Sequence, residues 1–134
     1  MRLVGQALVE VDAVVEALAD PSWRGVFDLD RMAIGGMSAG GMVTLRRLCD
    51  PHPFRCAAVE STAGDFSQMP YEGLHDSSRM ASLDPIRHID GWRPIPLLAL
   101  HSEADEWVPV GAIRSFVEAL KARYERVGSR PEQV

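Results

Sequence analysis

MAIGGMSAGGMVTLRRLC, residues 32–49, is the stretch that decides the fold. Residues 32–37 form a short apolar run of the kind that a buried parallel strand needs. Between residues 40 and 49 the apolar side chains return at helical spacing, and the two prolines of the following DPHP prevent the helix from continuing. The stretch therefore predicts a strand, a sharp turn at Ser38 and a helix.

The rest of the chain repeats this alternation. Before the strand and helix described above, we expect a helix from Val4 to Leu18 that ends at Asp20-Pro21. After them, we expect strands over 55–61 and 95–102 and then a helix over 110–128, capped by Gly128. Residues 62–94 are rich in glycine and proline and predict an irregular, lid-like excursion over the surface. The order predicts one α/β domain over residues 1–134, with a parallel sheet of about three strands flanked by helices.

Composition narrows the classes of function. The 134 residues carry a net charge of −5 and are 46% hydrophobic, which is typical of a globular protein without a basic face for nucleic acid or anionic lipid. Acidic residues interrupt the apolar pattern of the N-terminus, so it predicts neither a secretory signal nor a membrane span, and we expect a cytoplasmic protein. The two cysteines, Cys49 and Cys56, fit no metal-ligand spacing and predict reduced core residues. No metal or organic cofactor is indicated.

Ser38 is the candidate nucleophile. Parallel sheets carry their active sites at the carboxyl ends of the strands, where Ser38 is expected. A turn sharp enough to expose a serine hydroxyl there leaves little room for neighbouring side chains, which predicts the need for Gly36 and Gly40. The backbone N–H of Ala39, at the start of the next helix, would face a developing oxyanion. The alternative is a glycine-rich turn without chemistry.

A second polar loop follows the strand of residues 95–102. Asp105 comes a few residues after that strand and is therefore expected at the same edge of the sheet as Ser38. A carboxylate at this place could orient and stabilise a histidine. The alternative is that Asp105 is a helix cap or a turn residue before Pro109.

These two stretches resemble the α/β-hydrolase superfamily. DRMAIGGMSAGG, residues 30–41, resembles the strand and nucleophile elbow, and PIPLLALHSEADEWVP, residues 94–109, resembles the strand and acid loop. The resemblance is greatest to dienelactone-hydrolase-like esterases and to the catalytic domains of prolyl-oligopeptidase-type serine peptidases, and it covers nearly the whole chain. Ser102 stands where the acid loop usually has glycine.

The resemblance implies a mechanism. Ser38 would attack an ester or peptide carbonyl to form an acyl-enzyme that water hydrolyses, with Asp105 as the triad acid and the N–H of Ala39 as one oxyanion donor. Such triad chemistry needs no cofactor. The implied partner is a small ester or peptide substrate, without nucleic acid or membrane.

The implied triad lacks its histidine. The family order is Ser, Asp, His, and no histidine follows Asp105. His101 matches the acid loop, His52 is expected in an exposed loop, and His75 and His88 in the excursion are alternative bases. The strands that normally precede the elbow, with the second oxyanion donor, are also missing. We therefore expect a fragment of a longer hydrolase, with the elbow strand at an open sheet edge that favours self-association or binds missing segments.

Several residues near the two loops have two interpretations. Met37, Glu60, Ser61 and Thr62 should line the floor of a substrate pocket. Glu60 either meets a substrate amine or is bound by loop N–H groups, and Trp107 either forms a wall of the pocket or packs under its loop. Apolar residues of the excursion predict either a lid or a small satellite core: Phe66, Met69, Tyr71 and Leu74.

Two functions stay open at this point. The first is a serine hydrolase of carboxylic esters or peptides, inactive as this chain alone because the base is missing. The second is a non-catalytic remnant that acts as a binding or interaction module through its exposed sheet edge, with Ser38 inert.

Overall fold

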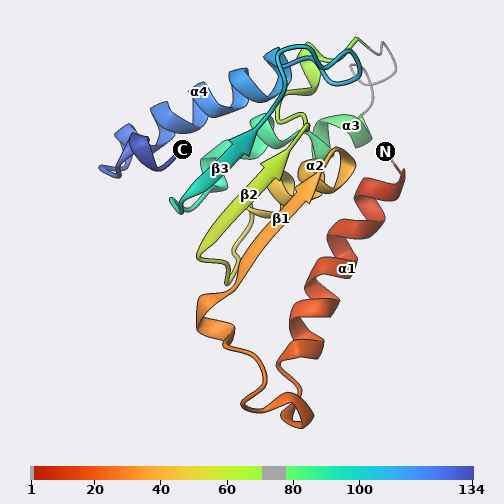
Figure 1. The fold of residues 1–134 in the computed structure, drawn as a ribbon, viewed down its shortest axis with the longest axis vertical. Coiled ribbons are helices and arrows are strands. Elements are labelled where there is room, and N and C mark those ends of the chain that lie inside the picture. Colours follow the sequence, from red (N-terminus) through yellow and green to blue (C-terminus); the bar gives the residue numbers. More distant parts are fainter. Residues whose placement is uncertain (1, 71–77) are drawn as a thin grey trace.

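The computed structural model of the chain describes residues 2–70 and 78–134 (Figure 1). Tyr71, Leu74 and His75 lie outside the described residues, so the predictions made for their side chains stay predictions.

Within the described residues, three parallel strands form one sheet in the order β1-β2-β3. The strands are β1 (Ala33–Met37), β2 (Cys56–Glu60) and β3 (Leu97–Leu100). Met37 pairs with Glu60, and Glu60 pairs with Leu100, so all three strands end in one row. The predicted partial α/β fold is confirmed, and the elbow strand β1 lies at an edge of the sheet as expected.

The long helices cover one face of this sheet. They are α1 (Arg2–Leu18), α2 (Ala39–Arg47) and α4 (Gly111–Arg126), and Figure 1 shows α2 behind the sheet, α1 alongside β1 and α4 beyond β3. The main core lies between this face and the helices, with Leu45 of α2, Val59 of β2 and Phe116 of α4 all buried. Burial of these apolar side chains is the main force that holds the helices on the sheet.

The first helix is only partly covered. Val4 is buried, whereas the other residues of its predicted apolar face, Leu8, Val11, Val15 and Leu18, are half-buried. A groove of about 610 Å³, lined largely by apolar side chains, separates the helix from β1 and the loop that leads into it. The amphipathic pattern predicted the helix and its inner face correctly, but that face packs fully only where α1 meets α2.

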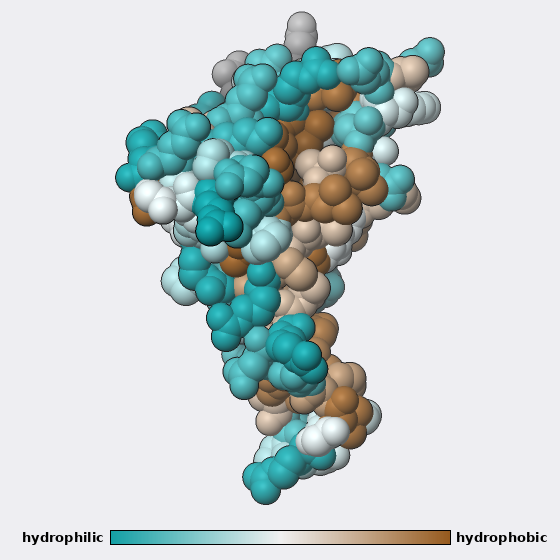
Figure 2. Space-filling view, turned by 60° about the vertical axis from the view of Figure 1, so that its left-hand side comes forward, coloured by the Kyte–Doolittle hydropathy of each residue, from teal (hydrophilic) through white to brown (hydrophobic). Residues whose placement is uncertain are grey.

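The other face of the sheet is bare. Met37, Leu98 and Leu100 point to this face and are all more than half exposed, at 64%, 55% and 52%. Figure 2 shows that hydrophobic surface gathers along one side of the molecule. The prediction that both cysteines are core residues is half wrong: Cys49 is buried, whereas Cys56 begins β2 on the bare face and is exposed.

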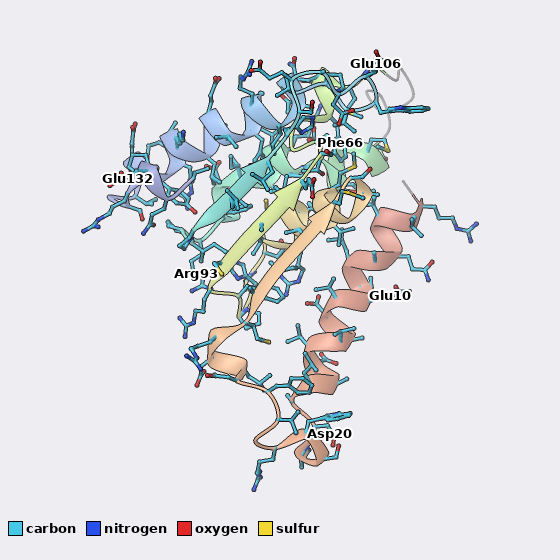
Figure 3. All side chains as sticks on the ribbon, viewed as in Figure 1. Glu10, Asp20, Phe66, Arg93, Glu106 and Glu132 are labelled. Atoms are coloured by element: carbon cyan, nitrogen blue, oxygen red, sulfur yellow. The ribbon has the colours of Figure 1, made fainter. Side chains whose placement is uncertain are left out.

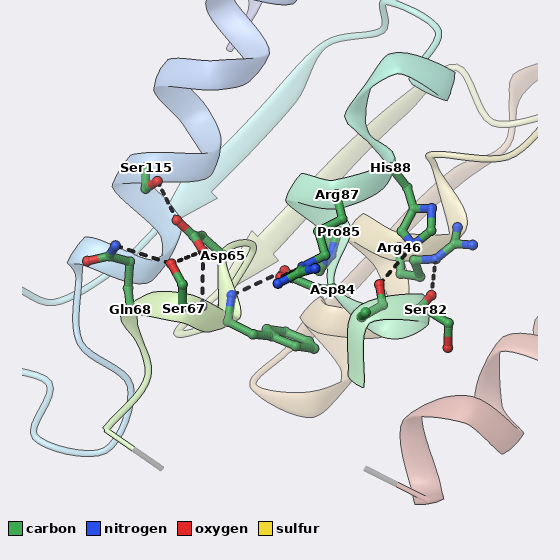
Figure 4. A network of polar contacts seen from close by, with 12 residues as sticks. Arg46, Asp65, Ser67, Gln68, Ser82, Asp84, Pro85, Arg87, His88 and Ser115 are labelled. Carbon is green, nitrogen blue, oxygen red and sulfur yellow. Dashed lines mark hydrogen bonds and ion pairs between the residues drawn. The ribbon is translucent and has the colours of Figure 1, made fainter. Parts of the chain in front are cut away.

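The excursion between β2 and β3 is tied down by polar contacts. It contains the 3-10 helices η3 (Phe66–Gln68) and η5 (Pro85–Gly91) and the α-helix α3 (Ser78–Leu83). Asp65 accepts hydrogen bonds from the hydroxyls of Ser67 and of Ser115 on α4, both at 2.6 Å (Figure 4). Phe66 and Met69 are buried in a second apolar cluster, which favours the satellite core for these two residues. A lid stays a prediction for the excursion as a whole.

A buried tyrosine holds the entry to β3. The hydroxyl of Tyr124 on α4 accepts hydrogen bonds from the indole N–H of Trp92 at 3.0 Å and the backbone N–H of Ile95 at 2.9 Å, and it donates to the carbonyl of Ile95. Tyr124 and Trp92 are both fully buried. The segment that enters β3, and so leads to Asp105, is therefore anchored to α4 just before the strand begins.

Candidate active site

Ser38 lies in a strained turn between β1 and α2. Its backbone has φ 51° and ψ −120°, a conformation that residues other than glycine rarely adopt. Its N–H donates to the carbonyl of Glu60 at 2.9 Å, and its own carbonyl accepts the hydroxyl of Thr62 at 2.7 Å. Contacts with Glu60 at the end of β2 and with Thr62 just beyond it therefore hold the residue in this conformation, as expected where strain is stored at a functional site.

The two glycines around Ser38 play different parts. A Cβ on Gly36 would lie 2.4 Å from the carbonyl carbon of Gly40, so the turn requires glycine at 36. A Cβ on Gly40 would meet nothing within 4 Å. The expected crowding is therefore confirmed at Gly36, whereas the same steric argument is wrong for Gly40, because a Cβ at that position points into open space.

The helix that follows presents unpaired amides to the site. Ser38 is the N-cap residue of α2, and its side chain does not cap the helix. The first N–H groups of a helix, here from Ala39 onward, have no partner within the helix and carry its positive dipole end. This arrangement can stabilise negative charge next to the exposed hydroxyl of Ser38.

Asp105 is held as an ionised carboxylate in the loop after β3. Its Oδ1 accepts the backbone N–H groups of Trp107 and Val108, both at 2.9 Å. The N–H of Val108, then that of Trp107, lower the pKa of Asp105 below its ordinary value, and His101 and the hydroxyl of Ser61 lower this pKa further. The side chain is 15% exposed, so a small part of it remains accessible to solvent. Asp105 is therefore a turn residue, as the alternative interpretation predicted. Its carboxylate can still serve as the acid of a catalytic triad.

The row of strand ends brings the two loops to the same edge. Met37, Glu60 and Leu100 are paired across the sheet, and the next residues along the chain are Ser38, Ser61 and His101. The N–H of Ser61 donates to the carbonyl of Leu100 at 3.0 Å, which continues the ladder by one step. Figure 3 shows Glu106, the neighbour of Asp105, beyond this upper edge and Arg93 at the opposite end of the strands.

Among the described residues, no histidine ring is hydrogen-bonded to Ser38. His101 Nε2 lies 2.8 Å from the carbonyl of Val108 and 3.6 Å from Oδ2 of Asp105, and its ring is 4% exposed. His88 Nε2 lies 3.1 Å from the carbonyl of Ala81 within the excursion (Figure 4). His101 therefore supports the acid loop, as the resemblance implied.

His52 lies in the loop before β2, at the end of the sheet remote from Ser38. The prediction that it is exposed is wrong: it is half-buried and stacks on Phe54. Burial, followed by the charge of Arg93, lowers the pKa of His52 to about 4, so its ring is neutral at pH 7. It is a structural residue of this loop.

The residues predicted for the pocket floor divide into three groups. Met37 and Glu60 are exposed and line a shallow hollow of about 300 Å³ on the bare sheet face. Ser61 is half-buried beside Asp105. Thr62 is only 1% exposed and lies under the elbow, so the pocket prediction is wrong for this residue. Trp107 is 78% exposed, which excludes packing under its loop.

Sequence reasoning missed the contact between Thr62 and the elbow. The one signal was the second glycine after Ala39: a Cβ on Gly41 would lie 2.5 Å from the Cβ of Thr62. Such a glycine indicates close approach of another segment, but the sequence does not say which segment approaches.

The sheet, the strained serine at the start of α2 and the acid loop after β3 define a partial α/β-hydrolase fold. A sequence profile of the prolyl oligopeptidase family matches residues 6–130. The chain therefore belongs to the prolyl oligopeptidase family, one of the two groups that its motifs resemble.

The fold is similar to that of an acylaminoacyl peptidase from Pyrococcus horikoshii, solved in an orthorhombic crystal form. The TM-score is 0.68 at 20% sequence identity, and the match covers 87% of this chain but only 20% of that chain. No curated protein sequence matches the chain. In residues 2–70 and 78–134, no helix is long and apolar enough to cross a membrane.

Proposed function

We propose that the chain is part of the catalytic domain of a serine hydrolase that cleaves a carboxylic ester or peptide bond. Ser38 is the nucleophile, Asp105 the triad acid and the N–H of Ala39 an oxyanion donor. The observation that carries the proposal is the backbone of Ser38, which has φ 51° at the N-terminus of α2 and is tied to β2. Membership of the prolyl oligopeptidase family supports the same chemistry.

The proposal assigns the general base to a residue outside residues 2–70 and 78–134. His88 and His101 are engaged by backbone carbonyls, and His52 lies at the other end of the sheet. Serine is a weak nucleophile without a base to accept its proton. His75 is the one histidine of this chain that fits that assignment. Unless His75 is the base, the chain alone should turn over substrate poorly.

A fluorophosphonate probe with added imidazole tests the proposal. Imidazole in solution can take the place of a missing histidine and accept the proton of Ser38. We expect slow labelling without imidazole, faster labelling as its concentration rises, and no labelling of Ser38→Ala, with intact mass as the readout. Absence of Ser38-dependent labelling in the folded chain, with or without imidazole, would overturn the proposed function.

The proposal covers both esters and peptides as substrates and assigns one wall of the acyl pocket. Trp107 offers a large apolar surface beside the acid loop and would form one wall of the acyl pocket. A Trp107→Ala variant should weaken binding of bulky acyl probes more than that of an acetyl probe.

We also propose a cytoplasmic protein, because both cysteines are free thiols, which fits a reducing compartment.

A second candidate function is supported by the bare sheet face. Exposed Met37, Leu98 and Leu100 would favour an interaction module that self-associates through this face, with Ser38 inert. Gel filtration would then show a species larger than 14.7 kDa, and Leu98→Lys would restore the monomer. A monomeric wild-type chain would contradict this second function.

A further inference from the structure

We propose that the strand-end pair Ser61–Thr62 is a positioning element that fixes the nucleophile elbow and the acid loop relative to each other. This inference rests on the proposed function of Ser38 and Asp105. Both members of the pair act through those two residues, so they are positioning residues.

Thr62 determines the direction of the elbow peptide. Its hydroxyl donates to the carbonyl of Ser38 at 2.7 Å, and the N–H of Met42 reaches the same oxygen at 3.1 Å. The carbonyl of Ser38 and the N–H of Ala39 belong to one planar peptide group. Two donors that hold the carbonyl on one side therefore aim the N–H of Ala39, the proposed oxyanion donor, on the other.

Ser61 provides the second half of the element. Its backbone N–H is bonded to the carbonyl of Leu100, which places the residue between the elbow and the acid loop. Its hydroxyl contributes to the lowered pKa of Asp105, after the two backbone N–H groups and His101. The backbone bond to Leu100, one residue before His101, is the contact that joins this strand end to the start of the acid loop.

The backbone of Ser61 explains how neighbouring residues serve two different partners. Within the described residues, Ser38 and Ser61 are the non-glycine residues with positive φ, at 51° and 44°. Both directly follow paired strand residues in adjacent strands. A regular strand would send the side chains of 61 and 62 to opposite faces of the sheet. The left-handed turn at Ser61 instead leaves one hydroxyl at Asp105 and the next under Ser38, at a cost in strain that is typical of functional sites.

The first test replaces Ser61 by glycine. Glycine accepts φ 44° without strain, so Ser61→Gly keeps the turn while it removes the side chain with its hydroxyl. We expect the pKa of Asp105, followed by NMR of its carboxyl carbon during a pH titration, to rise toward the ordinary aspartate value. Ser129→Gly, remote from the site after α4, is the matched control and should leave this pKa unchanged.

The second test compares Thr62→Val with Thr62→Ser. Valine keeps the shape of the side chain but loses the hydroxyl, and serine keeps the hydroxyl. We expect hydrogen exchange at the amide of Met42, which is bonded to the same carbonyl of Ser38, to become about fivefold faster in the valine variant, as loss of one hydrogen bond allows. Exchange should return to the wild-type rate in the serine variant. The amide of the buried Leu120 reports any global loss of stability.

The inference is overturned if the pKa of Asp105 is the same in Ser61→Gly and wild type. Equal acceleration at Leu120 and Met42 would also overturn it, because Thr62 would then stabilise the fold as a whole. Both readouts are independent of labelling at Ser38. A failure of the positioning element therefore leaves imidazole-dependent labelling intact, whereas a failure of the proposed function abolishes labelling whatever the pair does.

Discussion

The backbone N–H of Ser38 donates to the carbonyl of Glu60 at 2.9 Å, which extends the β1–β2 ladder by one residue past the last paired strand residues. The chain reverses into α2 directly after this bond, while Gly36 of β1 lies against the backbone of Gly40. The turn that exposes the serine is thus built from the edge of the sheet and from one close backbone contact.

Substitutions at the two elbow glycines should have opposite effects. Gly36→Ala places a Cβ 2.4 Å from the carbonyl carbon of Gly40, and we expect a loss of roughly 2 kcal/mol or more in the free energy of unfolding. Gly40→Ala meets nothing within 4 Å and gains helix propensity, so it should be neutral or stabilise by up to about 1 kcal/mol. Urea unfolding of both variants tests this, and equal destabilisation would contradict it.

Removal of one hydroxyl should loosen the entry to β3. Tyr124→Phe leaves the buried N–H of Trp92, and the N–H and carbonyl of Ile95, without their partner. We expect the variant to lose about 2 to 3 kcal/mol of stability, because unpaired buried polar groups are costly. The urea midpoint should fall with an unchanged m-value, and a midpoint equal to that of wild type would show that this anchor contributes nothing.

Asp105 should make stability depend on pH in the acid range. Its pKa in the folded chain is lowered, first by the N–H of Val108, so its ionised form favours the folded state. That contribution is fully present above the unfolded pKa of about 3.9 and is lost as the pH falls through the lower folded pKa. Asp105→Asn should therefore be less stable than wild type at pH 7, and the gap should close on acidification. A gap that stays constant to pH 2 would contradict this.

The two cysteines should react very differently. Burial raises the pKa of the Cys49 thiol to about 12, whereas Cys56 is exposed on the bare sheet face. We expect Ellman's reagent to modify one thiol in the native chain and two in urea. Cys56→Ser should leave no rapidly reacting thiol, and rapid reaction of Cys49 would mean that the segment directly after α2 is not buried as described.

The sequence predicted the elements that have a strong local pattern. Apolar spacing located the strands and the long helices, and Gly128, at φ 70°, follows the end of α4 as the predicted cap. Ser38 was located because its motif is contiguous and depends on local sterics. The contact between Thr62 and Ser38 was missed because it joins residues that are far apart in the sequence.

Errors arose where burial depends on which face of an element is covered. Alternation along β2 is the same whether helices cover one face or both, so Cys56 could not be recognised as exposed. The half-buried His52 contacts Arg93, which comes from the distant approach to β3, so these surroundings cannot be inferred from its neighbours in the sequence. Crowding at an elbow glycine likewise depends on the direction of its Cβ, which the sequence pattern does not contain.

The turn at residue 38 should stabilise negative charge on its side chain. The most direct test is the pKa of a thiol at that place, measured as the alkylation rate against pH in the double variant Ser38→Cys, Cys56→Ser, since a thiolate needs no histidine to report it. We expect this pKa to lie clearly below the value of about 8.5 for a free cysteine, because the amides at the start of α2 face the thiolate. A pKa at or above 8.5 would show that the elbow does not favour an anion, and would contradict the assignment of Ser38 as the nucleophile.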